Sequence, residues 1–216
     1  HIEVELTNTN GFTGQYSKTV WDVALAGRLV QGDDFLSVME FRSSTAADFD
    51  YSGLKKNVTE RLEQAQRIVP IEAGKYPVVF APAQVGYVLR PLVASLNGKA
   101  FARGISPLID RLGKPFVDQR IKLVDDGRLP QKPTSAPFDR EGVPTRRTVL
   151  VEQGRPTAVL LDLQTATELE AESTGNATGQ GPAPHHLLLE PGTAACQELK
   201  EQIDEGILVY NTMGAW

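Results

Sequence analysis

Apolar and polar residues alternate along the first thirty residues of the chain. The run Ile2-Glu3-Val4-Glu5-Leu6 has the two-residue period of a half-buried strand. Asn10-Gly11 is a strong turn signal for a hairpin, and Asp33-Asp34 interrupts the second apolar run. The pattern therefore predicts a series of antiparallel strands at the start of the chain.

A helical period follows these strands. Apolar residues recur at offsets of four, three and four, namely at Val58, Leu62, Ala65 and Val69. This spacing predicts a helix from about residue 53 to residue 69. Asp50 or Ser52 can cap its start, and Pro70 is expected to end it. The residues that follow, 71–76, are interpreted as a linker.

The next segment predicts a strand and then a second helix. Residues 77–80 are apolar and bounded by prolines, so we expect a short strand buried on both faces. Pro82 is a favoured first-turn residue for the helix, whereas Pro91, inside it, removes a backbone donor and should kink it. Asn97-Gly98 is expected to end this helix in a left-handed conformation. Its predicted apolar face consists of Val85, Val88, Leu89, Leu92 and Leu96.

Strand patterns return after residue 120. We expect a strand over 121–124 and a hairpin with arms 148–151 and 157–161, joined through Gln153-Gly154-Arg155. A Gly/Thr/Pro-rich loop, a strand, a helix and a last strand are predicted over 173–184, 186–189, 194–203 and 207–210. Because strands come in runs with few helices between them, the predicted class is α+β with mixed, largely antiparallel sheets.

Composition narrows the function classes. The net charge is −5, and Lys and Arg are spread along the chain, so direct binding of nucleic acid is not expected. No window approaches 18 uncharged apolar residues, and no secretory signal opens the chain, so we expect no membrane partner. The single cysteine, Cys196, suits a reducing compartment, and a cytoplasmic location is predicted.

Few residues offer chemistry of their own. A Gly-x-Ser-x-Gly elbow, a Walker motif and a dinucleotide fingerprint are all absent from the sequence. His185 and His186 are adjacent, so in a strand they point to opposite faces and cannot easily hold one metal ion. Cys196 lies on the apolar side of a predicted helix, which favours a buried small hydrophobe over a nucleophile. Asp139 and Glu141 are either paired acids for acid–base work or parts of a rigid Pro/Gly-bounded loop.

Three blocks of sequence carry a family resemblance. They are Pro77-Val78-Val79-Phe80-Ala81-Pro82, then Ser135-Ala136-Pro137-Phe138-Asp139-x-Glu141-Gly142-Val143, then Ser173-Thr174-Gly175-Asn176-Ala177. In their order and spacing they resemble the PmbA-like (TldE) branch of the TldD/PmbA family of peptide-processing metalloproteases, whose older label is modulator of DNA gyrase. The resemblance implies a fragment of a two-domain protein. Residues 1–74 would be the end of the N-terminal half and residues 75–216 an incomplete C-terminal core domain, with sequence missing at both ends.

The resemblance also locates a zinc motif that this chain lacks. The active, TldD branch carries His-Glu-x-x-x-His on the helix after the strand, which falls here at Arg90, Pro91 and Ser95. Arginine offers no lone pair, proline cannot act as a general base, and residues 2–184 contain no histidine. We therefore expect no metal ligands and no cofactor in this chain, with zinc only in a partner subunit.

The function implied is that of a non-catalytic subunit, which shapes the chamber and binds unfolded peptide beside a TldD-like subunit or a second copy of itself. The peptide would meet two loops, at Phe138, Asp139, Gly142, Thr174, Gly175 and Asn176. Two alternatives stay open. One is a self-contained, metal-independent hydrolase that uses Asp139, Glu141 or Cys196, and the other is a purely structural, self-assembling module.

Overall fold

The chain forms two compact units. The structure is a computed structural model that describes residues 1–211, apart from the side chains of Gln31, Asp34, Cys196, Gln197 and Lys200. One unit consists of His1–Val4, Ser17–Gly74 and Pro130–Pro133, and the other of Glu5–Tyr16, Lys75–Leu129 and the residues from Thr134 onward. The predicted division into family domains at residue 74 stays a prediction.

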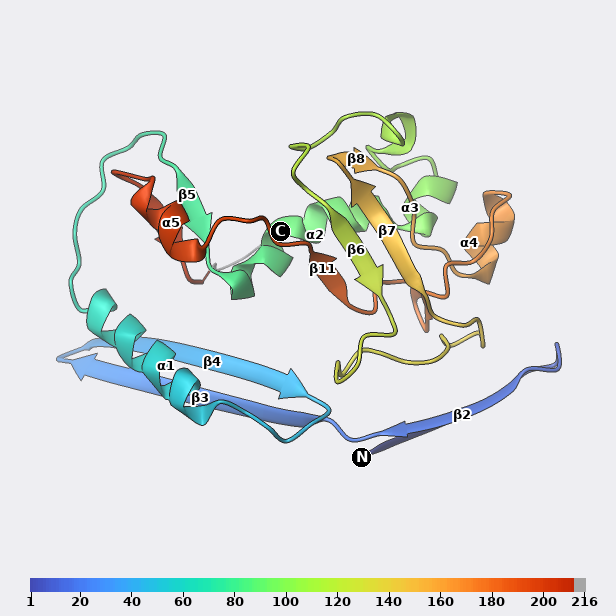
Figure 1. Ribbon diagram of the computed structural model, residues 1–216, viewed down its shortest axis with the longest axis horizontal. Helices are drawn as coiled ribbons and strands as arrows, with labels where there is room; N and C mark the ends of the chain where they lie inside the picture. Colours follow the sequence, from blue (N-terminus) through green and yellow to red (C-terminus); the bar gives the residue numbers. More distant parts are fainter. Residues whose placement is uncertain (212–216) are drawn as a thin grey trace. The chain divides into compact units, whose positions relative to one another are not determined.

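A long two-stranded ribbon dominates the first unit. Strands β3 (Trp21–Gln31) and β4 (Asp34–Ser44) pair antiparallel along their whole length, from Trp21 opposite Ser44 to Gln31 opposite Asp34. Helix α1 (Tyr51–Ala65) lies along one face of this ribbon (Figure 1). Alternate residues of β3, among them Leu25 and Leu29, are half-buried on that face, as the two-residue period predicts.

An ion-pair cluster lies inside this first unit. Glu40 is only 3% exposed, and its two carboxylate oxygens accept from Arg42 at 2.7 Å and from Arg61 of α1 at 2.5 Å. A buried carboxylate is tolerated when cations and hydrogen bonds compensate its charge, so this cluster fixes α1 to β4.

Helix α1 begins at Tyr51, two residues before the predicted start near residue 53, with one of the two predicted caps, and it ends earlier than predicted. The Asp50 side chain accepts a hydrogen bond from the backbone N–H of Gly53 at 2.8 Å, which confirms the predicted cap. The helix ends at Ala65, whereas the apolar spacing and Pro70 predicted an end near residue 69. Ile68 is 90% exposed, so the last predicted turn has no surface to bury against and does not form.

A four-stranded antiparallel sheet organises the second unit. Its order is β11 (Leu187–Leu189), β6 (Leu123–Asp126), β7 (Arg147–Glu152) and β8 (Arg155–Pro156). The predicted β7–β8 hairpin is confirmed, and its two turn residues, Gln153 and Gly154, both have positive φ, as a type I′ turn requires. The second arm is shorter than predicted. Thr157 still donates to the carbonyls of Leu150 and Val149 in β7, but further along the chain Leu160 bridges to Asn97 instead.

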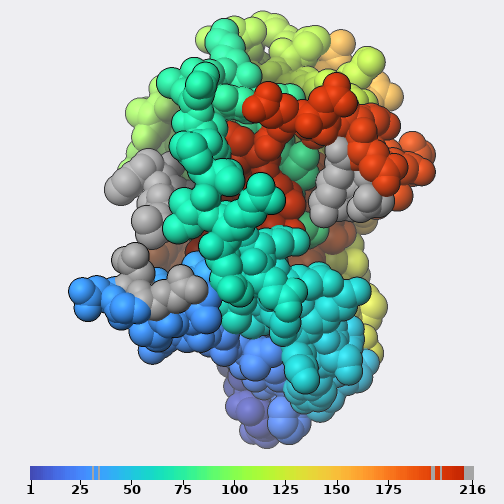
Figure 2. Space-filling model, turned by 90° about the vertical axis from the view of Figure 1, so that its left-hand side faces the viewer, coloured from blue at the N-terminus to red at the C-terminus, as the bar shows by residue number. Residues whose placement is uncertain are grey.

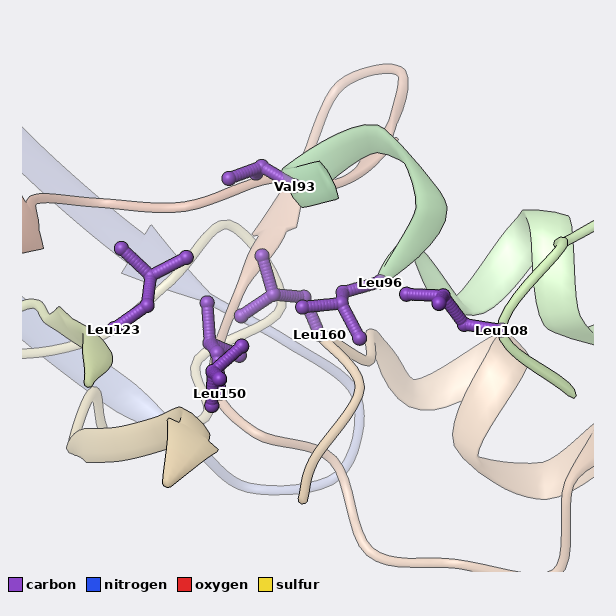
Figure 3. Close-up of a cluster of buried hydrophobic side chains, with 7 residues drawn as sticks. Val93, Leu96, Leu108, Leu123, Leu150 and Leu160 are labelled. Carbon is purple, nitrogen blue, oxygen red and sulfur yellow. The ribbon is translucent and has the colours of Figure 1, made fainter. Parts of the chain in front are cut away.

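The core of the second unit lies between this sheet and helix α2 (Pro82–Ser95) (Figure 3). The side chains converge from segments far apart in the sequence, and each is at most 9% exposed. They are Val93, Leu96, Leu108, Leu123, Leu150, Val151 and Leu160. Val88, which the helical period assigned to this buried face, is 47% exposed.

Strand β5 (Val78–Phe80) precedes α2, as predicted, but it is not buried on both faces. It pairs in parallel with β12 (Ile207–Val209) alone, and Val78 is 45% exposed. Figure 2 shows the surfaces of these two chain regions side by side. A buried parallel strand needs neighbours and covering layers, and within residues 1–211 this pair has one neighbour per strand.

Asn97 starts a helix and does not end one in the left-handed conformation. Helix α3 (Gly98–Ala102) follows α2 directly, and the Asn97 side chain accepts from the Lys99 backbone N–H at 2.9 Å. The φ of Asn97 is −89°, so the predicted left-handed stop is wrong.

The remaining elements are short. Strands β1 (Ile2–Thr7) and β2 (Thr13–Lys18) form the hairpin that Asn10-Gly11 predicted. The predicted loop 173–184 contains a small hairpin of β9 (Ala177–Thr178) and β10 (Gly181–Pro182). Also present are a 3₁₀ turn, η1 (Ile109–Arg111), and helices α4 (Leu163–Glu168) and α5 (Cys196–Glu201). The fold class is α+β, with small, mostly antiparallel sheets, as predicted.

Candidate functional site

Helix α2 keeps its position after β5 but does not carry zinc ligands. Pro91 lies inside the helix, Arg90 and Pro91 are exposed, and the Ser95 hydroxyl donates to the Pro91 carbonyl at 2.8 Å. A guanidinium has no lone pair for a metal, and this hydroxyl is already bonded to its own helix. Among the residues described, no group of three or more His, Cys, Asp or Glu side chains could hold a metal ion. Positions 90, 91 and 95 therefore do not fit a zinc ion.

The loop 137–145 is organised by Asp139. One oxygen of its carboxylate accepts from the backbone N–H of Glu141 at 2.9 Å and of Val143 at 3.0 Å. The other oxygen accepts from the N–H of Ala177 at 2.8 Å, so Asp139 also ties this loop to the segment 173–177. Asp139 is 4% exposed. Three backbone donors on one buried carboxylate make it a structural anchor of the loop.

Phe138 anchors the same loop through aromatic contacts. Its ring lies edge-to-face with Phe12, with centroids 5.1 Å apart, and with Tyr16 at 5.3 Å. Gly142 packs under Phe12, since a Cβ added there would lie 2.6 Å from the ring. The β1–β2 hairpin residues thus hold the outer side of the loop.

The segment 173–177 is fixed by its own hydrogen bonds. The Thr174 hydroxyl accepts from the Leu161 N–H at 2.8 Å and donates to the Leu161 carbonyl at 3.1 Å. Gly175 has a φ of +74°, and a Cβ there would lie 2.5 Å from the Pro144 carbonyl oxygen. Only glycine fits this close approach of the two loops without strain.

Asn176 connects the segment to the central sheet. Its amide donates to Asp125 of β6 at 2.6 Å and to the Ala183 carbonyl at 3.0 Å. Asp125 also accepts from the His186 N–H at 2.9 Å, and the His185 ring donates through Nε2 to the Gly175 carbonyl at 2.7 Å. Burial raises the pKa of Asp125, and the hydrogen bonds from Asn176 and His186 offset part of this increase.

Glu141 is the second acid of the loop, and it is bound at the start of α4. Its carboxylate accepts from the Leu163 N–H at 2.7 Å, next to Asp162, which caps the same helix through Thr165. Burial raises the pKa of Glu141, and the negative charges of Asp162 and Asp139 add to that shift. Asp139 and Glu141 are therefore held by separate sets of backbone donors.

The structure brings the six predicted peptide-binding residues into one region and buries all of them. Phe138, Asp139, Gly142, Thr174, Gly175 and Asn176 all lie in the two packed loops. Their contact with peptide stays a prediction. The side chains of the four that are not glycine already have partners within the chain. Arg140 and Arg146 of the first loop are exposed, and Arg146 donates to the Ser173 carbonyl at 2.7 Å.

Sequence reasoning missed the buried partner of Asn176. The sequence analysis did not single out Asp125, because no local motif links it to Asn176, about fifty positions later. Cys196 lies in α5, but its side chain is outside the part of the chain that the structure describes, so the proposed nucleophile is not placed.

Sequence comparison places the chain in a metallopeptidase family. The family described as PmbA/TldA metallopeptidase C-terminal domain matches residues 73–216. The chain belongs to this family, which confirms the resemblance drawn from its three sequence blocks.

Individual relatives agree with this assignment. A metalloprotease of Methanocaldococcus jannaschii is 24% identical over 189 residues, covering 82% of this chain and 42% of the relative. A PmbA homologue of Haemophilus influenzae is 29% identical over 160 residues, covering 74% and 34%. PmbA of Escherichia coli O157:H7 is 29% identical over 140 residues, covering 65% and 30%. The chain thus spans less than half of the length of each of these relatives.

Solved structures share the fold. TldE from Thermococcus kodakarensis superimposes with a TM-score of 0.90 at 24% identity, covering 98% of this chain and 50% of that chain. A protein of Thermotoga maritima described as a putative modulator of DNA gyrase gives the same values. Among the described residues, no helix is long and apolar enough to cross a membrane.

Proposed function

We propose that this chain is a zinc-less, non-catalytic subunit of a peptide-processing metalloprotease, which works beside a zinc-bearing relative and binds unfolded peptide. The observation that supports it most is helix α2. The helix follows β5, packs Val93 and Leu96 into the core, and has Arg90, Pro91 and Ser95 where active members of the family would carry the zinc motif. The helix that would hold the zinc motif is present, but the side chains that would bind zinc are not.

This chain would form a rigid part of the chamber surface, and that surface would bind the peptide. The two packed loops, 137–145 and 173–177, are fixed by Asp139, Thr174 and Asn176, so they would not rearrange when a peptide arrives. A peptide would then meet the exposed Arg140 and Arg146 and the backbone of the loop tips. Preformed surfaces of this kind bind with a small entropic cost.

The alternative of a metal-independent hydrolase has less support. A pair of acids for acid–base catalysis needs a free carboxylate within reach of the reacting atoms. Asp139 accepts three backbone hydrogen bonds, and the carboxylate of Glu141 accepts one from Leu163. Both carboxylates hold loops and a helix end in place.

Co-expression of the full reading frame with a His-Glu-x-x-x-His relative tests the proposal. We expect a stable complex that degrades an unfolded peptide, loses activity with a chelator, and loses it when the motif glutamate of the relative becomes glutamine. The matched change in this chain, Glu141→Gln, should leave cleavage by the complex intact. Peptide cleavage by this chain alone in the presence of chelator would overturn the proposal, as would a failure of the full-length proteins to associate at micromolar concentration.

A further inference from the structure

Two cationic side chains contact the small hairpin formed by β9 and β10. The ammonium of Lys99, in α3, donates to the Gln180 carbonyl at 2.6 Å. The guanidinium of Arg140 lies against Gly179, since a Cβ added to that glycine would lie 3.0 Å from Nη1. Gly179 and Gln180 are adjacent, with Cα atoms about 3.8 Å apart, so cations from two distant segments of the chain meet at the tip of one hairpin.

The segments that carry these cations are themselves bound to the hairpin. Asn97, at the start of α3, donates from its side chain to the Pro182 carbonyl at 2.6 Å. On the other strand, the backbone N–H of Arg140 donates to the Ala177 carbonyl at 3.3 Å. Gly181 leaves room for the lysine, because a Cβ there would lie 2.7 Å from its Nζ. Backbone contacts on both strands therefore fix where the two cations lie.

No acid neutralises either cation within the part of the chain that the structure describes. Lys99 forms no ion pair there, and the Arg140 side chain forms neither an ion pair nor a hydrogen bond. The acids on either side of Arg140 in the sequence are bound elsewhere, Asp139 to three backbone N–H groups and Glu141 to that of Leu163. An ammonium has three donors and a guanidinium five, so both cations keep donors for an anion.

We propose that Lys99 and Arg140 form a carboxylate subsite, which makes this chain prefer peptides with acidic side chains or a free C-terminal carboxylate. The inference rests on the proposed function, because it names the kind of peptide that the same loops would bind. A guanidinium can bind a carboxylate through two parallel hydrogen bonds, and the ammonium adds a second positive charge. Arg140 is exposed and Lys99 half-buried, so we expect a preference of about fivefold in dissociation constant, which salt should reduce.

Direct binding of labelled, unfolded peptides to the full reading frame tests the subsite. Fluorescence anisotropy is measured without the zinc-bearing relative, so the result does not depend on cleavage. Three peptides of equal length are compared: one with glutamates and an amidated C-terminus, one with glutamines and a free C-terminus, and one with glutamines and an amidated C-terminus. We expect the uncharged third peptide to bind about fivefold more weakly than a carboxylate-bearing one. Whether the first or the second peptide binds more tightly shows which carboxylate is recognised.

Charge removal assigns the preference to these two residues. The double variant Lys99→Gln/Arg140→Gln should bind all three peptides with the affinity that the natural chain has for the uncharged one. Arg140→Gln alone breaks no hydrogen bond within the described residues, so it should leave the fold intact and reduce the preference about twofold. The matched control is Arg155→Gln. Arg155 is exposed and donates to the Gly113 carbonyl at 3.0 Å, far from the hairpin in the sequence, so this variant should keep the full preference.

Four results would overturn the subsite: no binding of any peptide, equal binding of the three peptides by the natural chain, a preference that the double variant retains, or an equal loss in Arg155→Gln. The proposed function is tested separately by cleavage in the complex with the zinc-bearing relative. Chelator-sensitive cleavage of all three peptides at equal rates and equal binding would support the subunit role and reject the subsite. Selective binding without cleavage in the complex would support the subsite and reject the subunit role.

Discussion

Asn176 donates a hydrogen bond from its side-chain amide to the carboxylate of Asp125 at 2.6 Å, and each of the two residues is 1% exposed. The same amide donates to the Ala183 carbonyl, and the Ala183 N–H returns a bond to the Asn176 carbonyl. This pair therefore joins the segment 173–177 to the central strand β6 and to the chain that leads into β11.

Replacing Asn176 with alanine should destabilise the protein strongly. The change removes the donor to one carboxylate oxygen of Asp125 and to the Ala183 carbonyl, while the bond from the His186 N–H to Asp125 remains. The two lost buried bonds together cost on the order of 3 kcal/mol. The matched control is Asn10→Ala, in an exposed hairpin turn, which should change stability by at most about 0.5 kcal/mol. Urea unfolding of both variants provides the comparison, and equal effects would show that the buried pair contributes little.

Asp125 should also give stability an unusual pH dependence. Its pKa is raised in the folded state, so the folded protein binds this proton at a higher pH than the unfolded chain does. The associated stability is fully present below the ordinary value near 3.8 and is lost as the pH rises through the raised value. Relative to Asp125→Asn, the natural protein should therefore lose stability with increasing pH in that window.

Asp118 provides the control with the opposite sign. Hydrogen bonds from Arg120 hold the pKa of Asp118 well below its usual range, so its contribution is present above the ordinary value and is lost as the pH falls. Asp118 and Arg120 are both exposed, so the effect of Asp118 on stability should be small and should disappear at high salt. If Asp125→Asn and Asp118→Asn gave pH slopes of the same sign, the assignment of Asp125 would be wrong.

Local chemistry explains which elements could be predicted from the sequence. The Asp50 cap, the Asn10-Gly11 turn and the Gln153-Gly154 turn depend on neighbouring residues alone, and all three form. The end of α1 and the burial of β5 depend on which surfaces are available to cover them, and both predictions were wrong. Periodicity reports which face of an element is apolar but not whether anything packs against it.

In the candidate site, too, local sequence predicts the loops but not their burial. The spacing of the Phe138–Val143 and Ser173–Ala177 blocks identified two loops, and the structure packs them together. Their burial could not be predicted, because it depends on Phe12, Tyr16 and Asp125, which are distant in sequence. A polar residue in a Gly/Pro-rich loop has the same local pattern whether it faces solvent or holds the loop together.

Removing Arg61, which pairs with a buried carboxylate, should destabilise the first unit more than removing Lys56, which belongs to an exposed ion pair. Glu40 is 3% exposed and is paired with Arg61 and Arg42, so Arg61→Ala leaves a buried carboxylate with one cation. We expect a loss of about 3 kcal/mol. Lys56→Ala breaks the exposed pair with Glu60, 3.8 Å apart, and should cost at most about 0.5 kcal/mol. Similar losses in thermal unfolding would show that burial of Glu40 adds nothing.

Pro91 should be dispensable for stability. It lies inside α2 and is exposed, and it removes the donor that would bond the Tyr87 carbonyl. Pro91→Ala should therefore leave the melting temperature unchanged or raise it. The free energy gained by the helix is up to roughly 3 kcal/mol. Ala94→Pro, also exposed in the same helix, should lower stability by about that amount. A large fall in melting temperature for Pro91→Ala would show that packing requires the kink.

The purified chain should hold no stoichiometric zinc. Arg90, Pro91 and Ser95 occupy the positions of the family motif, and none of them supplies a ligand of the kind that zinc prefers. Of the two internal histidines, His185 already donates to the Gly175 carbonyl. Elemental analysis after dialysis without chelator should give far less than one zinc per chain. Any weak uptake should disappear in a His185→Ala/His186→Ala variant, because these imidazoles are the best remaining nitrogen ligands. One zinc per chain that survives both dialysis and this double substitution would require a different set of ligands and would contradict the zinc-less assignment.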